Sequence, residues 1–165
     1  VLAGTVLETA GCRVTCLFPH KLSRAPGVDN DESQVLMVED ERHRFLFTGD
    51  AGCEVERQLV LPSGSGPGIA VLKAGHHGSA TSSGEPFLSA VSPQLVVFSC
   101  AAGNPFGFPH GRVIARLRAL EIPWVCTSWS GHVRLRSQKR AIRVSLSPRE
   151  LPSILISTRI SHTIQ

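Results

Sequence analysis

Short apolar runs separated by loops rich in glycine and proline are the main pattern of this sequence. The continuous runs at 69–73 and 95–99 are typical of strands that are buried on both faces. Apolar residues return at helical spacing over 52–61, 86–91 and 111–120. This order predicts a β-rich α/β fold. The predicted strands cover residues 14–18, 35–38, 44–48, 69–73, 95–99, 124–127 and 132–136.

The composition is that of one globular domain rather than of a fibrous or disordered chain, with 42% hydrophobic residues among 165. Lysine and arginine outnumber aspartate and glutamate by 17 to 13, but the first 136 residues carry 12 basic and 12 acidic residues. The basic excess is therefore weak support for nucleic-acid binding by the folded part. No apolar run approaches the roughly 20 residues that span a bilayer. The chain opens without Met and without a basic leader, which indicates a fragment or a processed chain.

The regular pattern weakens after residue 136. Ile142, Val144 and Leu146 still alternate with polar residues, but Pro148 and Pro152 follow closely. We therefore predict a main domain over 1–136 and a basic C-terminal extension over 137–165 that is partly disordered.

Two of the predicted strands end in glycine followed by a side chain that can bind metal. The strand at 44–48 runs into Gly49 and Asp50, and the strand at 69–73 runs into Gly75, His76 and His77. Ends of strands are where α/β folds place their sites. A carboxylate and imidazoles suit zinc or manganese, and a carboxylate can also bridge two metal ions. A Gly-Asp pair after a strand is also a common turn, so these residues alone leave a structural reading of Asp50 open.

Several motifs together resemble the metallo-β-lactamase-like domain of ComEC-type DNA internalization (competence) proteins. The resemblance covers about residues 3–136, and its motifs occur in the order of that family. It implies that this chain is the C-terminal half of an αββα sandwich, an α+β sandwich with metal-dependent phosphodiesterase activity. The motifs lie at 30–36 (NDESQVL), 45–50 (FLFTGD), 71–83 (VLKAGHHGSATSS), 104–110 (NPFGFPH) and 127–133 (TSWSGHV).

The resemblance also implies roles for individual residues and for partners. Asp50 matches the bridging aspartate, and of the histidine pair we expect His77 to ligate the metal and His76 to meet the substrate phosphate. Asp50 and His76 are the expected catalytic residues, and both histidines are candidate zinc or manganese ligands. The expected partners are single-stranded DNA and the rest of a membrane channel in the bacterial inner membrane. The implied substrate-binding residues are Lys73, Ser79, Asn30, Ser33 and His110.

Two departures from the family pattern limit the expected activity. The main metal motif, His-x-His-x-Asp-His, is absent, since no histidine precedes His20. Phe108 stands where the family has histidine, and His110 is the nearest residue that compensates. We therefore expect weak or no activity from this chain alone, and an exposed apolar face that favours self-association. The alternatives are a degenerate structural or DNA-contact module, or a hydrolase of the same superfamily with a small-molecule substrate.

Overall fold

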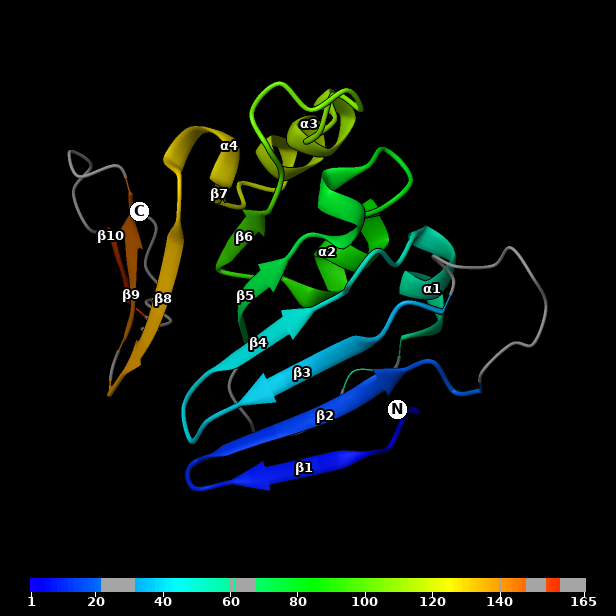
Figure 1. Cartoon of the computed structure of the whole chain (residues 1–165), viewed down its shortest axis with the longest axis vertical. Coiled ribbons are helices and arrows are strands. Elements are labelled where there is room, and N and C mark those ends of the chain that lie inside the picture. The colour runs from blue at the N-terminus through cyan, green and yellow to red at the C-terminus, as the bar shows by residue number, and fades with distance from the viewer. Residues whose placement is uncertain (22–31, 60, 62–67, 140, 148–153, 158–165) are drawn as a thin grey trace, which may run out of the picture.

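The computed structural model describes residues 1–21, 32–59, 61, 68–139 and 141–147, and the backbone of 154–157. These residues form two β-sheets and a set of short helices (Figure 1). The larger sheet has seven strands in sequential order, antiparallel from β1 to β4 and parallel from β4 to β7. Its strands are β1 (Val6–Thr9), β2 (Cys12–Phe18), β3 (Val35–Glu39), β4 (Arg44–Phe47), β5 (Ile69–Lys73), β6 (Leu95–Phe98) and β7 (Trp124–Cys126).

Helices α1 (Cys53–Gln58), α2 (Glu85–Val91) and α3 (Gly111–Ala119) lie in the connections between the parallel strands. Parallel neighbours need such crossovers, because a short hairpin cannot join them. The three helices pack on one face of the larger sheet and form the main core with it. Fully buried residues of that core include Val55, Leu88 and Leu117 from the helices and Leu46, Leu72 and Val96 from the strands.

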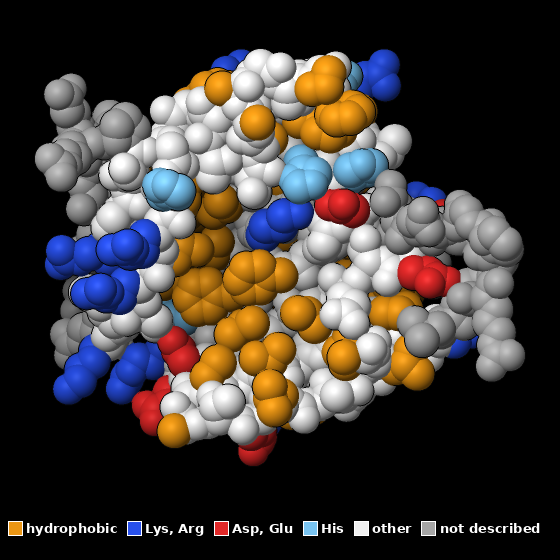
Figure 2. Space-filling view, viewed as in Figure 1, with side chains coloured by type: hydrophobic (Ala, Val, Ile, Leu, Met, Phe, Trp, Pro, Cys, Tyr) orange, Lys and Arg blue, Asp and Glu red, His pale blue; other side chains and the backbone are white. Residues whose placement is uncertain are grey.

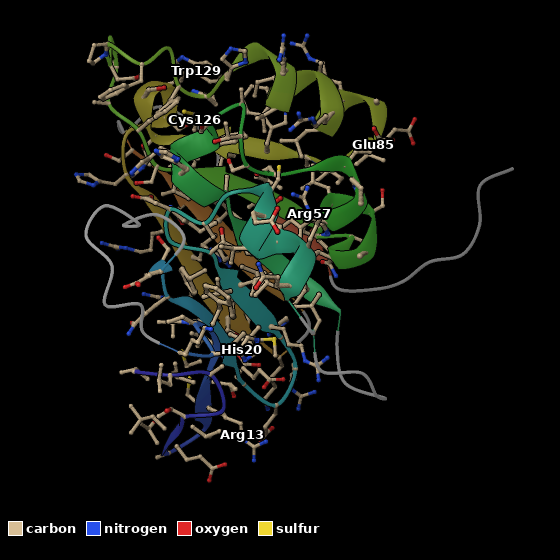
Figure 3. All side chains as sticks on the ribbon, turned by 90° about the vertical axis from the view of Figure 1, so that its right-hand side faces the viewer. Arg13, His20, Arg57, Glu85, Cys126 and Trp129 are labelled. Atoms are coloured by element: carbon tan, nitrogen blue, oxygen red, sulfur yellow. The ribbon has the colours of Figure 1, made fainter. Side chains whose placement is uncertain are left out.

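A side view shows the long axis of this arrangement (Figure 3). Arg13 on β2 lies at one end of the molecule, and Trp129, on the short helix α4 (Thr127–Ser130), lies at the other. Arg57 of α1 and Glu85 of α2 lie between them. The helices therefore cover the middle and the α4 end of the sheet, while the antiparallel strands extend past them.

A second sheet packs against the opposite face of the larger one. It contains β8 (Val133–Gln138), β9 (Ala141–Leu146) and β10 (Ile154–Ser157), in the order β10-β9-β8. Ile142 and Val144 of β9 are buried with apolar residues of β5, β6 and β7. We call the region of this face over β5–β7 the covered half. Its buried residues are Ala70, Val71, Leu95, Val97 and Val125.

The second sheet corrects one expectation about the end of the chain. The predicted boundary after residue 136 falls inside β8, and Ile142 and Val144 of β9 are buried against the body instead of lying outside it. The strands predicted at 124–127 and 132–136 are present as β7 and β8, which belong to different sheets. The division into domains itself stays a prediction.

Ser137 ties the second sheet to the turn between β3 and β4. Its hydroxyl donates to Asp40 Oδ2 and lies 2.7 Å from Nδ1 of His43, which is fully buried. Burial raises the pKa of Asp40, but the hydrogen bonds from Ser137 and from two backbone N–H groups outweigh it and leave that pKa below its usual value. Ser137 thus joins the second sheet to Asp40 and His43 in the turn between β3 and β4 of the larger sheet.

The rest of the same face lies over β1–β4, and among the described residues it is covered only at its inner edge, where Phe45 of β4 packs against the buried residues of the covered half. We call it the open half. Leu7, Val14, Val38 and Phe45 are paired across neighbouring strands and share this face, and Leu7 is 62% exposed. Figure 2 shows hydrophobic side chains gathered over this part of the sheet, with histidine, basic and acidic side chains close to them.

The α/β class predicted from the sequence is confirmed, with helices on one face of the larger sheet and a second sheet on the other, as in an α+β sandwich. One hairpin was not foreseen: the run at 5–18 forms two strands, β1 and β2, with Gly11 at φ +86° in the turn between them. No helix in the described part of the chain is both long and apolar enough to cross a membrane.

Candidate functional site

The histidine pair lies in a tight turn, η2 (Gly75–Gly78), directly after β5. His76 and His77 both have left-handed backbone angles, with φ of 44° and 56°. Residues other than glycine rarely adopt this conformation, and it is found often at functional sites. The turn is held by the His76 N–H, which donates to Gly49 O at 3.1 Å, and by Ser82 Oγ, which donates to Gly75 O at 2.7 Å.

The glycines on either side of the pair are required by packing. A Cβ on Gly75 would lie 2.6 Å from Ala51 O, and a Cβ on Gly78 would lie 2.7 Å from the ring of Phe98. Only glycine at these two positions lets the turn lie this close to the ends of β4 and β6.

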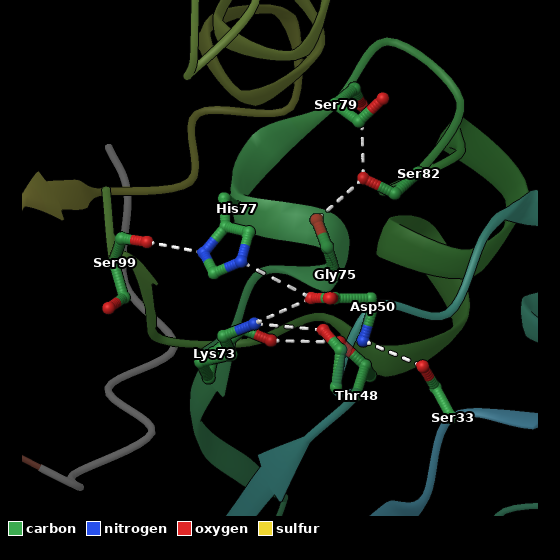
Figure 4. A network of polar contacts seen from close by, with 10 residues as sticks. Ser33, Thr48, Asp50, Lys73, Gly75, His77, Ser79, Ser82 and Ser99 are labelled. Atoms are coloured by element: carbon green, nitrogen blue, oxygen red, sulfur yellow. Dashed lines mark hydrogen bonds and ion pairs between the residues drawn. The ribbon is translucent and has the colours of Figure 1, made fainter. Parts of the chain in front are cut away.

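Asp50 and His77 meet at the edge of the sheet where β4 and β5 end (Figure 4). Asp50 Oδ1 lies 3.4 Å from His77 Nε2 and 3.9 Å from Lys73 Nζ. The Asp50 N–H donates to Ser33 Oγ at 3.1 Å, which fixes the backbone at that position. Because parallel strands end at the same edge, residues 50 and 77 come together although they are far apart in the sequence.

The tautomer of His77 follows from its other contact. Nδ1 lies 2.6 Å from Ser99 O, and a carbonyl oxygen only accepts, so Nδ1 carries the proton. In the neutral ring, Nε2 then has a free lone pair, and this lone pair faces the Asp50 carboxylate. Two acceptors at this distance of 3.4 Å repel each other unless a proton or a cation lies between them. In a metal-binding histidine, the ring nitrogen that does not bind the metal commonly donates its hydrogen to a carbonyl or carboxylate oxygen.

Lys73 adds a positive charge beside these groups. Nζ donates to Gly49 O at 2.8 Å, and the side chain is 21% exposed. Burial lowers the pKa of Lys73, and the neighbouring Asp50 carboxylate opposes part of that shift. The ammonium group is therefore held by the fold beside the carboxylate and not free in solvent.

A pocket of about 480 Å³ opens beside Asp50, His76 and His77. Its other wall comes from the loop after β6, through Phe106 and Phe108. Phe108 lies parallel to His77, with ring centroids 6.4 Å apart and planes at 19°, and meets His76 edge-on. Phe108, which stands where the family has a histidine, thus forms part of the pocket wall.

The other predicted residues lie in different places. Ser79 is buried, and its Oγ is 3.0 Å from Thr81 Oγ1. His110 caps α3, because its Nδ1 accepts from the Arg112 N–H. Neither lines the pocket, whereas Lys73 and Ser33 both contact Asp50 or its backbone. Asn30 lies outside the residues that the structure describes.

The sequence reasoning missed Ser99 and Phe106. Ser99 acts through its carbonyl oxygen, which every residue has, so no sequence signal identifies it. Phe106 is 71% exposed in the structure. The signal available in the sequence was a second phenylalanine two positions before Phe108, in the same loop with glycine and proline.

The donors that the structure brings together are few. Asp50 and His77 present Oδ1 and Nε2 to one another at 3.4 Å, a distance that suits an ion pair as well as two ligands of one ion. In the described part of the chain, no group of three or more histidine, cysteine, aspartate or glutamate residues is placed to hold a metal. Zinc in proteins usually has four ligands, so these two residues alone fall short of such a site.

The fold and the site define an α/β protein with a carboxylate–histidine–lysine centre at the ends of its parallel strands. No family model matches the chain. The chain is 36% identical over 152 residues to "Recombination protein 2" of Haemophilus influenzae, and 30% identical over 150 residues to "ComE operon protein 3" of Bacillus subtilis. It is 41% identical over 103 residues to "Competence protein ComA" of Neisseria gonorrhoeae.

These matches cover 88%, 90% and 62% of this chain, but only 18%, 19% and 15% of the relatives. The chain therefore spans less than a fifth of the length of the curated relatives that it matches. It is similar to one segment of much larger proteins, and one of them is named for competence.

Proposed function

We propose that this chain is the C-terminal part of the metallo-β-lactamase-like domain of a ComEC-type competence protein, and that the domain is a metal-dependent phosphodiesterase that acts on DNA during uptake. The similarity to the competence-named relative and to two others supports the family. The motifs that carry the resemblance are the ones that build the pocket, since 45–50 supplies Asp50 and 71–83 supplies the histidine pair.

The observation that carries this proposal is the arrangement of Ser99, His77 and Asp50. Ser99 O fixes the proton on Nδ1 of His77, and Nε2 is directed at Asp50 Oδ1. A cation between the two acceptors removes their repulsion, and a divalent metal has the right chemistry for an imidazole and a carboxylate. The residues present fit two ligands of a zinc or manganese site, and the remaining ligands would come from outside the described residues.

A bound metal would supply Lewis acidity and lower the pKa of a bound water, which is the chemistry that phosphodiester hydrolysis needs. The residues of this chain do the positioning. His76 lines the pocket beside His77, where it can donate to a phosphate oxygen. Lys73 places a cation 3.9 Å from Asp50 and favours a negatively charged substrate. We do not keep Ser79 and His110 as phosphate contacts, because their side chains have partners away from the pocket.

The proposed setting follows from the family. The substrate would be single-stranded DNA, and the partner would be the rest of a channel protein in the bacterial inner membrane. The domain would degrade the strand that is not imported. This chain covers less than a fifth of these two relatives, so under this proposal the channel would be formed by other parts of a larger protein.

Metal affinity tests the site in this chain. Titration of zinc or manganese, followed by calorimetry, is expected to show weak binding that Asp50→Asn or His77→Gln lowers at least about tenfold. His132→Gln is the matched control, because His132 is exposed and does not line the pocket. Equal affinity in wild type and in both site variants would refute the assignment of the ligands.

Cleavage of single-stranded DNA in the presence of manganese tests the activity. We expect slow turnover in the wild-type chain and none in Asp50→Asn, because two ligands hold a metal weakly. Robust turnover by the wild type would contradict the expected weakness. Turnover that Asp50→Asn leaves unchanged would contradict the proposed centre.

The second candidate is a non-catalytic DNA-contact module, and Phe108 is the observation that favours it. Its ring packs on both histidines, at a position where the family has a histidine. A phenyl ring neither ligates a metal nor donates to phosphate. DNA binding that is independent of metal, without cleavage under any metal, would support this alternative over the enzyme.

A further inference from the structure

Three roughly parallel aromatic rings form a row at the pocket. Phe106 and Phe108 have ring centroids 5.5 Å apart with planes at 21°, and Phe108 and His77 have centroids 6.4 Å apart with planes at 19°. All three residues line the pocket that contains Asp50. The row therefore begins at the candidate centre and ends at Phe106, towards solvent.

Phe106 is the outer ring of this row and is 71% exposed. Leaving a phenyl ring in water is unfavourable, and exposed apolar groups beside a pocket mark binding surfaces more often than isolated ones do. The Phe108 ring already contacts its inner side. Most of the Phe106 surface is thus accessible to a second flat group.

The loop holds these rings in a defined position. Asn104 donates from Nδ2 to Ala101 O at 3.0 Å and to Phe108 O at 2.8 Å, and its Oδ1 accepts from the Phe108 N–H at 2.9 Å. Gly107 between the two phenylalanines has φ of +68°, which glycine adopts without strain. The rings are therefore preorganised, so that little conformational entropy is lost when a ligand binds.

We infer that Phe106 and Phe108 form a stacking platform for an unpaired base of a single-stranded nucleic acid. The inference rests on the proposed function, because that function places the phosphodiester of the same strand at Asp50 and His77. Bases stack on aromatic side chains in many single-strand binding proteins, and a duplex keeps its bases stacked on each other. The two histidines that line the pocket with the rings, and Lys73 at 3.9 Å from Asp50, favour a polyanion with flat groups over a purely apolar partner.

The platform offers few free hydrogen-bonding groups that could distinguish one base from another. Both amide hydrogens and the carbonyl oxygen of Asn104 are engaged within the loop. Phe106 and Phe108 offer only ring surface. Recognition by stacking alone tolerates any base, as a protein that handles DNA of any sequence requires.

The test compares two strands that differ only in their bases. The wild-type chain is titrated, in EDTA so that no cleavage occurs, with a fluorescent oligothymidylate of about 12 nucleotides and with an abasic strand of the same length. Fluorescence anisotropy is expected to show at least about fivefold tighter binding of the strand that has bases, the lower limit for stacking of one base. The Phe106→Ala variant is expected to bind both strands equally.

Two further variants separate stacking from a general loss of apolar surface. Phe106→Trp keeps a flat ring and is expected to retain the preference. Leu7→Ala removes an exposed apolar side chain from β1, far from the loop in sequence and in the sheet, and is also expected to retain it.

Three results would overturn the inference: equal affinity of the wild type for the two strands, an unchanged preference in Phe106→Ala, or no measurable binding of either strand. None of them depends on metal or on cleavage. Loss of the base preference together with manganese-dependent cleavage that needs Asp50 would reject the platform and leave the proposed function intact. A base preference in a chain whose metal affinity is unchanged by Asp50→Asn and His77→Gln would keep the platform and reject the proposed metal centre.

Discussion

The covered half and the open half of the larger sheet differ in what lies on them, although they share one face. Over β5–β7, the second sheet buries Val71, Leu95 and Val97 together with Ile142 and Val144. Over β1–β4, the corresponding row is left partly or largely in water, and Leu7 at its edge is 62% exposed. Both halves are apolar, so composition alone does not explain the difference in burial. Cover by a second layer therefore decides how much each apolar residue contributes to stability.

The largest effect is expected in the covered half. Ile142 has no exposed surface, and Ile142→Ala would remove buried methyl groups and leave a cavity between the sheets. We expect the free energy of unfolding to fall by about 2–5 kcal/mol, measured by urea denaturation.

Arg143→Ala is the matched control, because Arg143 is the neighbouring residue on β9 and is exposed. Its expected change is within about 0.5 kcal/mol. If Ile142→Ala costs less than about 1 kcal/mol, the second sheet does not fold as part of the same cooperative unit. The comparison between the two halves would then fail.

A smaller effect is expected at the polar contact that joins the second sheet to the turn after β3. Ser137→Ala removes the hydroxyl that donates to Asp40 and contacts the buried His43 Nδ1. Leaving a buried polar group without this partner is expected to cost about 1–3 kcal/mol. Denaturation at neutral pH measures the difference from the wild type.

The same variant has an expected pH signature. The folded-state pKa of Asp40 is lowered, so its contribution to stability is present above 3.8 and is lost as the pH falls through the folded-state value. Ser137→Ala raises that pKa towards 3.8, so the variant should lose less stability than the wild type between neutral and acidic pH. An equal loss in both proteins would show that Ser137 does not hold the Asp40 carboxylate.

The parts of the fold that the sequence predicted are those whose signal is local. β5 and β6 were identifiable because strands buried on both faces need continuous apolar runs, and α3 because its apolar residues recur on one side. The second sheet was not predicted. Ile142 and Val144 alternate as a strand requires, but their partners on β5 lie about 70 positions earlier in the chain, and only the folded structure shows that contact.

The same limit applies to the candidate site. Asp50 and His77 were singled out because both follow strands, whose ends carry the sites of α/β folds, and in the structure they lie together, 3.4 Å apart. The tautomer of His77 was not predictable, since it depends on a backbone carbonyl 22 residues away. Phe108 was recognised only as a missing histidine. Its role in the pocket wall depends on how Asn104 folds the loop around it.

The smallest effect is expected in the open half. Leu7 lies on the edge strand β1 and pairs with Val14, but no layer covers it among the described residues, so most of its side chain is in water in the folded state as well as in the unfolded one. Leu7→Ala is therefore expected to change the free energy of unfolding by at most about 0.5 kcal/mol, against about 2–5 kcal/mol for Ile142→Ala. Urea denaturation at several protein concentrations measures this. A cost above about 1 kcal/mol that grows with protein concentration would mean that a second copy covers this face in solution. The open half would then be buried in the same way as the covered half, by another chain.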